Sequence, residues 1–235
     1  MKFIGLNLTI MPRIALFNLL IFTLLLPLRF AVAAETNHTF AQWEKEIKAF
    51  ETADRTNPPP KHCILFTGSS TIRLWTNLVN EFPGQPVVGR GVGGCEIVDI
   101  THFADRIVFP YEPKMILLRC GGNDINAGKS PEQVLADFKE FVATVRVKLP
   151  ETEIVFVAQN PTLARLKNRD KEQAMNKLIK EFASQNPHLQ YCEMTDLVLD
   201  KEGNVRPDLF RADKLHFNEA GNKLMAERVR PFLPK

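Results

Sequence analysis

The chain has 235 residues, of which 45% are hydrophobic and 24% charged, enough for one domain with a sizeable apolar core. Its 30 basic and 27 acidic residues give a formal net charge of +3, and Lys2, Arg13 and Arg29, which lie in an acid-free segment, account for the whole excess. Without that segment the chain has no net positive charge, which argues against nucleic acid as a partner.

Residues 1–34 have the pattern of an export signal. Lys2 and Arg13 form a positive flank, residues 14–28 are mostly apolar, and small residues at 31–34 offer a cleavage site. The apolar run is short for a permanent membrane span, which takes roughly 20 residues. We therefore expect a signal peptide that is removed on export to the periplasm or medium and leaves no stable membrane anchor. An uncleaved anchor is the alternative.

Residues 35–60 are expected to form an N-terminal helix and a proline-rich lead-in. Apolar side chains recur at helical spacing within residues 38–54. Three consecutive prolines at 58–60 then end the pattern, because proline cannot continue a helix.

Residues 61–235 are expected to form one domain in which strands and helices alternate. Apolar runs predict strands at residues 63–67, 86–88, 115–119, 154–158 and 189–194. Amphipathic stretches predict helices at residues 72–82, 96–109, 130–149, 170–185 and 218–229. Apolar strands separated by such helices indicate an α/β fold with a parallel sheet covered on both faces. Ligand sites in such sheets lie beyond the carboxyl ends of the strands.

The turn after the first strand contains two adjacent hydroxyls, Ser69 and Ser70. A sharp strand-to-helix turn exposes a side chain and directs the free N–H groups of a helix N-terminus at the same point. A nucleophile that develops an oxyanion needs both features. By itself, however, the pattern is more typical of a serine that caps a helix.

Three later loops contain groups that would complete such a site. Gly94 follows the second strand and could present its N–H to a negative charge, although a tight turn is by itself the commoner explanation. Asn123 follows the third strand and could donate its amide to an oxyanion or form an Asx turn. Asp213 and His216 precede the last helix, where the carboxylate could orient the imidazole, or both could be surface residues. Together these groups are the parts needed for acyl transfer.

In this combination and order, the sequence resembles the SGNH hydrolases, the GDSL-type esterase and lipase family. The family's Gly-Asp-Ser block corresponds to Gly68-Ser69-Ser70. The later blocks correspond to Gly94, to Gly121, Asn123 and Asp124, and to Asp213 and His216. The resemblance extends from residue 64 to residue 216.

The resemblance implies a three-layer α/β/α, flavodoxin-like fold with five parallel strands. It also implies ester hydrolysis by a Ser70–His216–Asp213 triad, without metal or other cofactor. The oxyanion hole would consist of the Ser70 N–H, the Gly94 N–H and the Asn123 side-chain amide. Expected substrates are small acyl or carbohydrate-linked esters, with lysophospholipase or thioesterase activity as the alternative. The sequence predicts neither the natural substrate nor the oligomeric state.

Two residues, one within a family motif and one next to a motif, need separate consideration. Ser69 occupies the usual aspartate position, but Asp213 already supplies the orienting acid, so we expect activity to survive. Cys95 follows the oxyanion glycine at a predicted helix N-terminus, where a thiol can acidify and line the pocket or can simply pack. It is one of four cysteines, whose pairing the sequence leaves undecided: Cys63, Cys95, Cys120 and Cys192.

Three other functions use the same residues differently. One is a non-catalytic glycan-binding protein on this fold. Another is a metal-dependent phosphoesterase using Asp124, Asp213 and His216, although these acids lack the clustering of a two-metal site. The third is a thiol enzyme using Cys95. Specificity would depend on the loops at residues 125–129 and 161–169.

Overall fold

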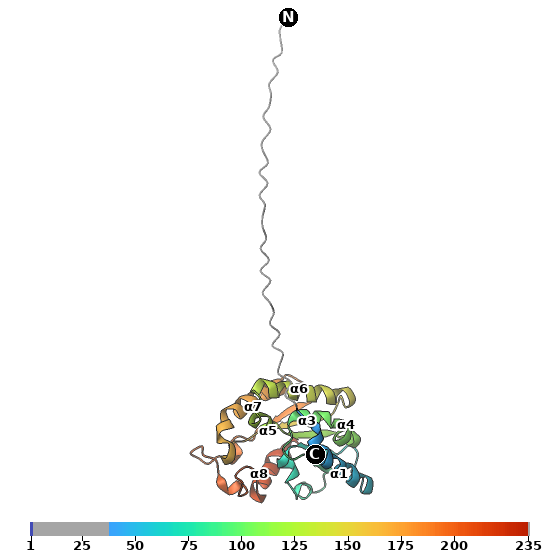
Figure 1. The fold of residues 1–235 in the computed structure, drawn as a ribbon, viewed down its shortest axis with the longest axis vertical. Coiled ribbons are helices and arrows are strands. Elements are labelled where there is room, and N and C mark those ends of the chain that lie inside the picture. Colours follow the sequence, from blue (N-terminus) through green and yellow to red (C-terminus); the bar gives the residue numbers. More distant parts are fainter. Residues whose placement is uncertain (2–37, 235) are drawn as a thin grey trace. The chain divides into compact units, whose positions relative to one another are not determined.

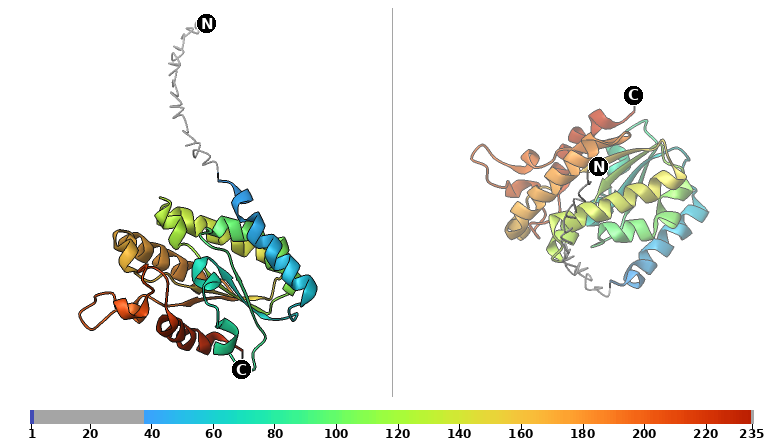
Figure 2. Two further views of the ribbon diagram at one scale, coloured as in Figure 1. Left: turned by 60° about the horizontal axis from the view of Figure 1, so that its bottom comes forward. Right: turned by 90° about the horizontal axis from the view of Figure 1, so that it is seen from above.

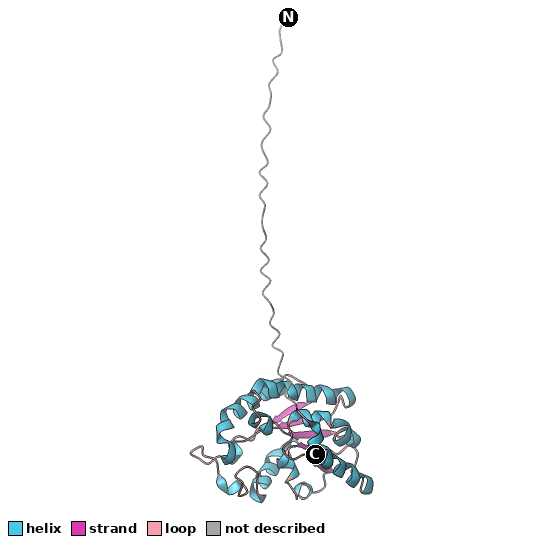
Figure 3. Ribbon diagram, in the orientation of Figure 1, coloured by secondary structure: helices cyan, strands magenta, loops and turns pink. Residues whose placement is uncertain are grey.

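A computed structural model describes Met1 and residues 38–234, so the predicted export signal lies almost wholly outside the described residues. The compact unit begins at Thr39 and contains one five-stranded sheet (Figure 3). Its strands are β1 Ile64–Gly68, β2 Val87–Gly91, β3 Met115–Arg119, β4 Glu153–Val157 and β5 Leu189–Cys192. Every pairing is parallel and the order is β2-β1-β3-β4-β5, which confirms the predicted sheet.

Helices cover both faces of the sheet, as the three-layer prediction requires (Figures 1 and 2). The α-helices are α1 Glu44–Thr56, α2 Ser70–Arg73, α3 Ile97–His102, α4 Ala104–Ile107, α5 Gly122–Asn126, α6 Pro131–Lys148, α7 Arg169–Ser184 and α8 Glu219–Val229. Short 3₁₀ turns connect several of them. Within the described residues, no helix has both the length and the apolar character needed to cross a bilayer.

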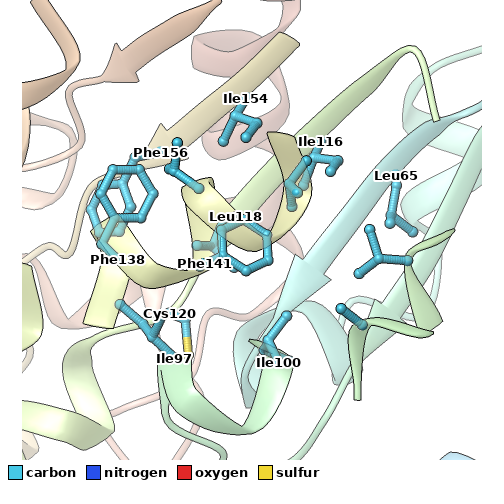
Figure 4. Close-up of a cluster of buried hydrophobic side chains, with 14 of the residues drawn as sticks. Leu65, Ile97, Ile100, Ile116, Leu118, Cys120, Phe138, Phe141, Ile154 and Phe156 are labelled. Atoms are coloured by element: carbon cyan, nitrogen blue, oxygen red, sulfur yellow. The ribbon is translucent and has the colours of Figure 1, made fainter. Parts of the chain in front are cut away.

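Alternate residues of the strands pack into two separate hydrophobic cores, one on each face of the sheet. Leu65, Leu118 and Phe156 point to the face packed by α1, α3, α4, α6 and α7, part of which Figure 4 shows. Their neighbours Phe66 and Leu117 point to the face packed by α2 and α8. Because both faces are buried, the central strands β1, β3 and β4 are largely apolar, which is why the sequence reveals them so clearly.

The strand order places a switch point beside β1. The chain passes from β1 outward to β2, and then returns to place β3 on the other side of β1. The loops that follow β1 and β3 therefore diverge, which leaves a crevice at the carboxyl ends of the strands. All the predicted site loops open onto this edge.

The helix predicted at residues 72–82 is wrong as a continuous element. The segment forms the single turn of α2 and a 3₁₀ turn at Leu78–Glu81. The Arg211 guanidinium donates a hydrogen bond of 2.8 Å to the Leu74 carbonyl, at the point where a longer helix would have used that carbonyl itself. The apolar residues Ile72, Trp75 and Leu78 still reach the core. Ile72 and Leu78 lie in the two turns, and Trp75 lies between them. The helix predicted at 96–109 is likewise divided into α3, α4 and a 3₁₀ turn.

Strand β2 runs further than predicted, through the first part of the glycine cluster. Gly89 pairs with Phe66 and Gly91 pairs with Gly68 in the parallel register. A Cβ on Gly91 would lie 2.1 Å from the Arg73 backbone nitrogen, so glycine is required for α2 to pack on this strand. The glycines thus permit a close helix–strand contact as well as a turn.

The substitution Gly68→Ala should destabilise the fold severely. Gly68 has a φ of +132°, and an added Cβ would lie 2.0 Å from the Arg119 carbonyl oxygen. The matched control is Gly203→Ala, because Gly203 has a φ of +83° with nothing within 4 Å of a Cβ. We expect Gly68→Ala to lower the free energy of unfolding by roughly 2 kcal/mol more than the control does, measured in urea. Equal losses would contradict this packing argument.

Candidate active site

The turn between β1 and α2 presents Ser70 at the carboxyl edge of the sheet. Gly68 adopts a left-handed backbone conformation, and the Ser69 N–H donates to the Arg119 carbonyl at 3.0 Å. The chain then enters α2, whose first residue is Ser70. The Ser69 side chain makes no capping hydrogen bond, so neither serine has the capping role that the sequence allowed. Ser70 is partly exposed, and its N–H lies at the unsatisfied end of the helix.

Ser70, His216 and Asp213 form a continuous hydrogen-bonded chain. His216 Nε2 lies 2.8 Å from Ser70 Oγ, and His216 Nδ1 lies 2.8 Å from Asp213 Oδ2. These distances are within the range for proton transfer from a hydroxyl to a base whose other nitrogen is held by an acid. The structure therefore brings together the three residues that the sequence proposed as a triad.

The Asp213 carboxylate is held in its ionised form by its surroundings. Its Oδ1 accepts hydrogen bonds of 2.9 Å from the backbone N–H groups of Leu215 and His216. Burial alone would raise its pKa, but these N–H groups and the His216 ring outweigh that effect and lower the pKa of Asp213 to about 2. The acid thus stays charged at neutral pH and fixes the orientation of the imidazole.

Asn123 lies in the first turn of α5, with one amide hydrogen already bonded. Its Nδ2 donates to the Cys95 carbonyl at 2.9 Å, which leaves its second N–H for a ligand. Gly122 lies beside it, and a Cβ there would lie 2.8 Å from Gln159 Oε1. An Asn amide fixed in this way is suited to donate to an oxyanion.

Gly94 lies in the loop after β2, in the left-handed region with a φ of +77°. It is exposed, and within the described residues its N–H has no hydrogen-bond partner. The loop is attached to the end of β1, because the Val92 N–H donates to the Gly68 carbonyl at 2.8 Å. Gly94 therefore keeps a free donor on a loop anchored beside the nucleophile turn, and its oxyanion role stays a prediction.

Sequence reasoning missed Arg165, whose guanidinium binds the side-chain oxygen of Asn123. One guanidinium nitrogen of Arg165 donates to Asn123 Oδ1 at 3.0 Å and to the Gly122 carbonyl at 3.2 Å. With its oxygen held, the amide must direct its NH₂ group the other way. The sequence assigned the segment 161–169 to specificity only, and it contains no motif that identifies Arg165 as a partner of Asn123.

A small polar cavity of about 40 Å³ adjoins the triad. Besides the triad serine and histidine, its lining includes the polar side chains Ser69, Thr71, Arg119, Asn123, Gln159, Asn160, Thr162, Arg165 and Glu172. Glu172, on α7, is 5% exposed. Burial raises the pKa of its carboxyl to about 7, against the opposing effect of the Arg165 and Arg119 charges. A buried carboxyl in a catalytic cavity is a marker of function that the sequence alone does not reveal.

Two residues considered as alternative catalytic groups are placed in structural roles. The first, Asp124, is fully buried and accepts hydrogen bonds from the Ile97 N–H at 3.2 Å and from the Lys129 ammonium at 3.5 Å. It does not line the cavity that contains His216. In the described part of the chain, no three His, Cys, Asp or Glu side chains gather in a way that could hold a metal ion.

The second, Cys95, packs in the core and does not line the cavity. It is fully buried, and burial raises the pKa of its thiol, so the acidified thiol that its position allowed does not form. Its sulfur lies 3.9 Å from the sulfur of Cys120. All four cysteines are free and buried in the structure.

Comparisons with known proteins bear on the family and the fold. A family model described as the GDSL-like Lipase/Acylhydrolase family matches residues 52–224. No curated protein gives a significant match.

Several solved structures share the fold at low sequence identity. One is a structure from Streptococcus pneumonia described as a proposed platelet activating factor. It has a TM-score of 0.74 at 20% sequence identity and covers 83% of this chain and 94% of that one. A GDSL-like lipase from Bacteroides thetaiotaomicron has a TM-score of 0.66 at 15% identity, covering 83% and 98%. A catalytic mutant of Axe2, an acetylxylan esterase from Geobacillus stearothermophilus, has a TM-score of 0.57 at 13% identity, covering 73% and 94%. These likenesses show the fold.

Replacing Arg165 should impair turnover through Asn123. We expect Arg165→Met to lower kcat for an aryl acetate roughly tenfold or more, because the Asn123 amide loses its fixed orientation. In combination with Asn123→Ala, the two losses should not add, since both remove the same donor. The matched control is Lys167→Met, an exposed cation on the same segment, which should leave kcat unchanged. Additive losses would show that Arg165 acts independently of Asn123.

The Glu172 carboxyl should make stability depend on pH. Its pKa rises from 4.5 to about 7 on folding, so between these values the folded state binds more protons than the unfolded state. Stability should therefore fall as pH rises through this window, by on the order of 3 kcal/mol at about 1.4 kcal/mol per pKa unit.

Glu172→Gln should not show this loss of stability. The test compares the free energy of unfolding of the variant with that of the wild type from pH 4 to 8. The matched control is Glu181→Gln, an exposed residue on the same helix, which should keep the wild-type pH dependence. A flat difference between wild type and Glu172→Gln would contradict the effect.

Proposed function

Because the chain belongs to the GDSL-like lipase/acylhydrolase family, we propose that it is an exported serine hydrolase for short-acyl esters of small or carbohydrate alcohols. One observation supports this above all: the unbroken chain of two 2.8 Å hydrogen bonds from Ser70 through His216 to Asp213. A serine hydroxyl gains nucleophilicity from such a base, and the base depends on such an acid for its orientation.

The proposed reaction follows from these contacts. His216 Nε2 removes the Ser70 proton while Oγ attacks the ester carbonyl, and Asp213 stabilises the imidazolium that forms. The oxyanion is held by the N–H groups of Ser70 and Gly94 and by the free N–H of Asn123. His216 then returns its proton to the leaving alcohol, and water activated by the same histidine releases the acid. No step requires a cofactor.

The cavity supports short acyl groups over long ones. Its volume of about 40 Å³ holds only a few atoms, and its lining is almost entirely polar. A long alkyl chain would gain little from burial against Glu172 and Arg119, because it offers their buried polar atoms no hydrogen bond. Lysophospholipid is therefore the less favoured substrate. The acetylxylan esterase of similar fold acts, by its description, on an acetylated carbohydrate, in keeping with this class.

The cellular setting is part of the proposal. The charged flank, apolar run and small residues of segment 1–34 support export with cleavage. The absence of net positive charge beyond this segment supports a small-molecule or glycan ester as the partner and not nucleic acid.

The alternative of a non-catalytic glycan-binding protein requires no aligned triad. Binding alone would not need an imidazole 2.8 Å from a partly exposed hydroxyl, with a carboxylate on its other nitrogen. The geometry therefore favours an enzyme. A fluorophosphonate, which reacts with activated serines, tests the difference directly, because a binding protein would leave Ser70 unlabelled.

Substituting the nucleophile gives the decisive measurement. We expect Ser70→Ala to lower kcat for an aryl acetate by at least about a thousandfold and to abolish fluorophosphonate labelling. Full activity in this variant would overturn the mechanism.

The neighbouring serine provides the matched control. Ser69→Ala removes a hydroxyl one residue away, outside the hydrogen-bonded triad, and should be labelled normally. Loss of labelling in Ser69→Ala with retention in Ser70→Ala would show that the nucleophile is one residue earlier.

A further inference from the structure

We propose that the cavity beside Ser70 is a subsite for a substrate hydroxyl group close to the scissile ester, bound by the Glu172 carboxylate and the Thr162 hydroxyl. The inference rests on the proposed function and deepens it, since it names a chemical group that the substrate must carry.

Three residues that line the cavity each carry a buried polar atom that the described part of the protein leaves without a partner. Within the described residues, Glu172 Oε2, Thr162 Oγ1 and Arg119 Nε are all buried and form no hydrogen bond. The three residues are 5%, 9% and 4% exposed, and all of them line the cavity. A buried polar atom without a partner costs roughly 1–3 kcal/mol, so three residues with such atoms around one cavity make it a candidate site for a polar ligand group.

The side chains that hold these atoms are fixed in place. Arg119 donates to the Ala158 carbonyl and to Asn160 Oδ1, which immobilises its guanidinium. Glu172 lies on the buried face of α7, on the same side as Met175 and Ile179, so it cannot swing into solvent without unpacking the helix. The unpaired atoms are therefore built into the site.

The cavity lining combines positive groups with a carboxyl, which suits a neutral polar group that can both donate and accept a hydrogen bond. An anionic group would be attracted by Arg119 and Arg165 but repelled by Glu172. A cationic group would be attracted by Glu172 but repelled by Arg119 and Arg165. A hydroxyl avoids both conflicts, because it donates its hydrogen to the carboxylate and accepts one from a neighbouring donor. The small volume limits this group to one within a few atoms of the ester.

Two kinds of substrate can supply such a hydroxyl. In a carbohydrate ester it is the free hydroxyl on the ring carbon next to the acylated one. In a hydroxyacyl ester it is carried by the acid itself. The chemistry recognised by Glu172 is the same, and only a comparison of substrates separates the two sources.

The test uses two matched substrate pairs with the full-length enzyme. The first pair is a monoacetylated methyl glycoside and its analogue that lacks the adjacent hydroxyl. The second is an aryl glycolate and the aryl acetate, each corrected for its uncatalysed rate. We expect kcat/KM to favour the hydroxyl-bearing member of one pair by roughly tenfold to a hundredfold, the range for a hydrogen bond to a charged group.

Variants then assign that preference to the cavity. Glu172→Leu should bring the ratio within the favoured pair close to one, and Thr162→Val, which keeps the side-chain shape, should reduce it. The ratio is informative even if a substitution lowers overall activity, and Thr162→Val serves if Glu172→Leu fails to fold. The control Glu181→Gln should leave the ratio at its wild-type value.

The outcomes separate this inference from the proposed function. If the wild type hydrolyses aryl acetate through Ser70 but shows no preference in either pair, the hydroxyl subsite is wrong and the esterase stands. The same holds if both Glu172→Leu and Thr162→Val keep the wild-type ratio. If the wild type hydrolyses none of the four esters, the proposed function fails first.

Discussion

The contact between the ends of β1 and β3 is the constraint on which the whole site depends. Gly68 and Arg119 are register partners, and only a glycine lets the two backbones approach this closely. The Arg119 carbonyl accepts a hydrogen bond from the Ser69 N–H, and the Gly68 carbonyl accepts one from the Val92 N–H in the loop after β2. A single backbone contact thus positions the nucleophile turn, the glycine loop and the start of the segment that carries Asn123. Strand pairing therefore positions the nucleophile turn, whereas His216 and Asp213 are held by separate contacts of a later segment.

Two carboxylates near the nucleophile have opposite environments. Asp213 receives two backbone N–H groups and an imidazole, and its pKa is held low at the protein surface. Glu172 receives no hydrogen bond from the described residues, and burial raises its pKa. Environments that separate two acids in this way assign them different roles. The first is paired within the protein, whereas the second is the group to which the proposed substrate hydroxyl would bind.

The sequence predicted what local pattern and strand pairing determine. Fully buried parallel strands leave long apolar runs, and the loops at their carboxyl ends must lie together, so the order of the motifs was enough to group Ser70, Asn123 and His216. It could not predict the break after Arg73, because the helix pattern there is intact and a distant arginine, Arg211, takes the Leu74 carbonyl. It also could not predict the role of Glu172, which lies in an ordinary amphipathic helix and becomes unusual only through what surrounds it. Tertiary contacts decide both cases.

The separation of the triad along the chain has a consequence for how activity arises. Ser70 and His216 are 146 residues apart, and the segment bearing His216 is attached through Arg211 to the Leu74 carbonyl and through the Lys214 carbonyl to Ala164. These long-range contacts close the largest loop in the site, so the triad depends on pairing two segments that are distant in the chain. The nucleophile turn belongs to the central strands and takes shape without them. The serine is therefore an ordinary alcohol in any form of the chain in which the segment bearing His216 is not in place.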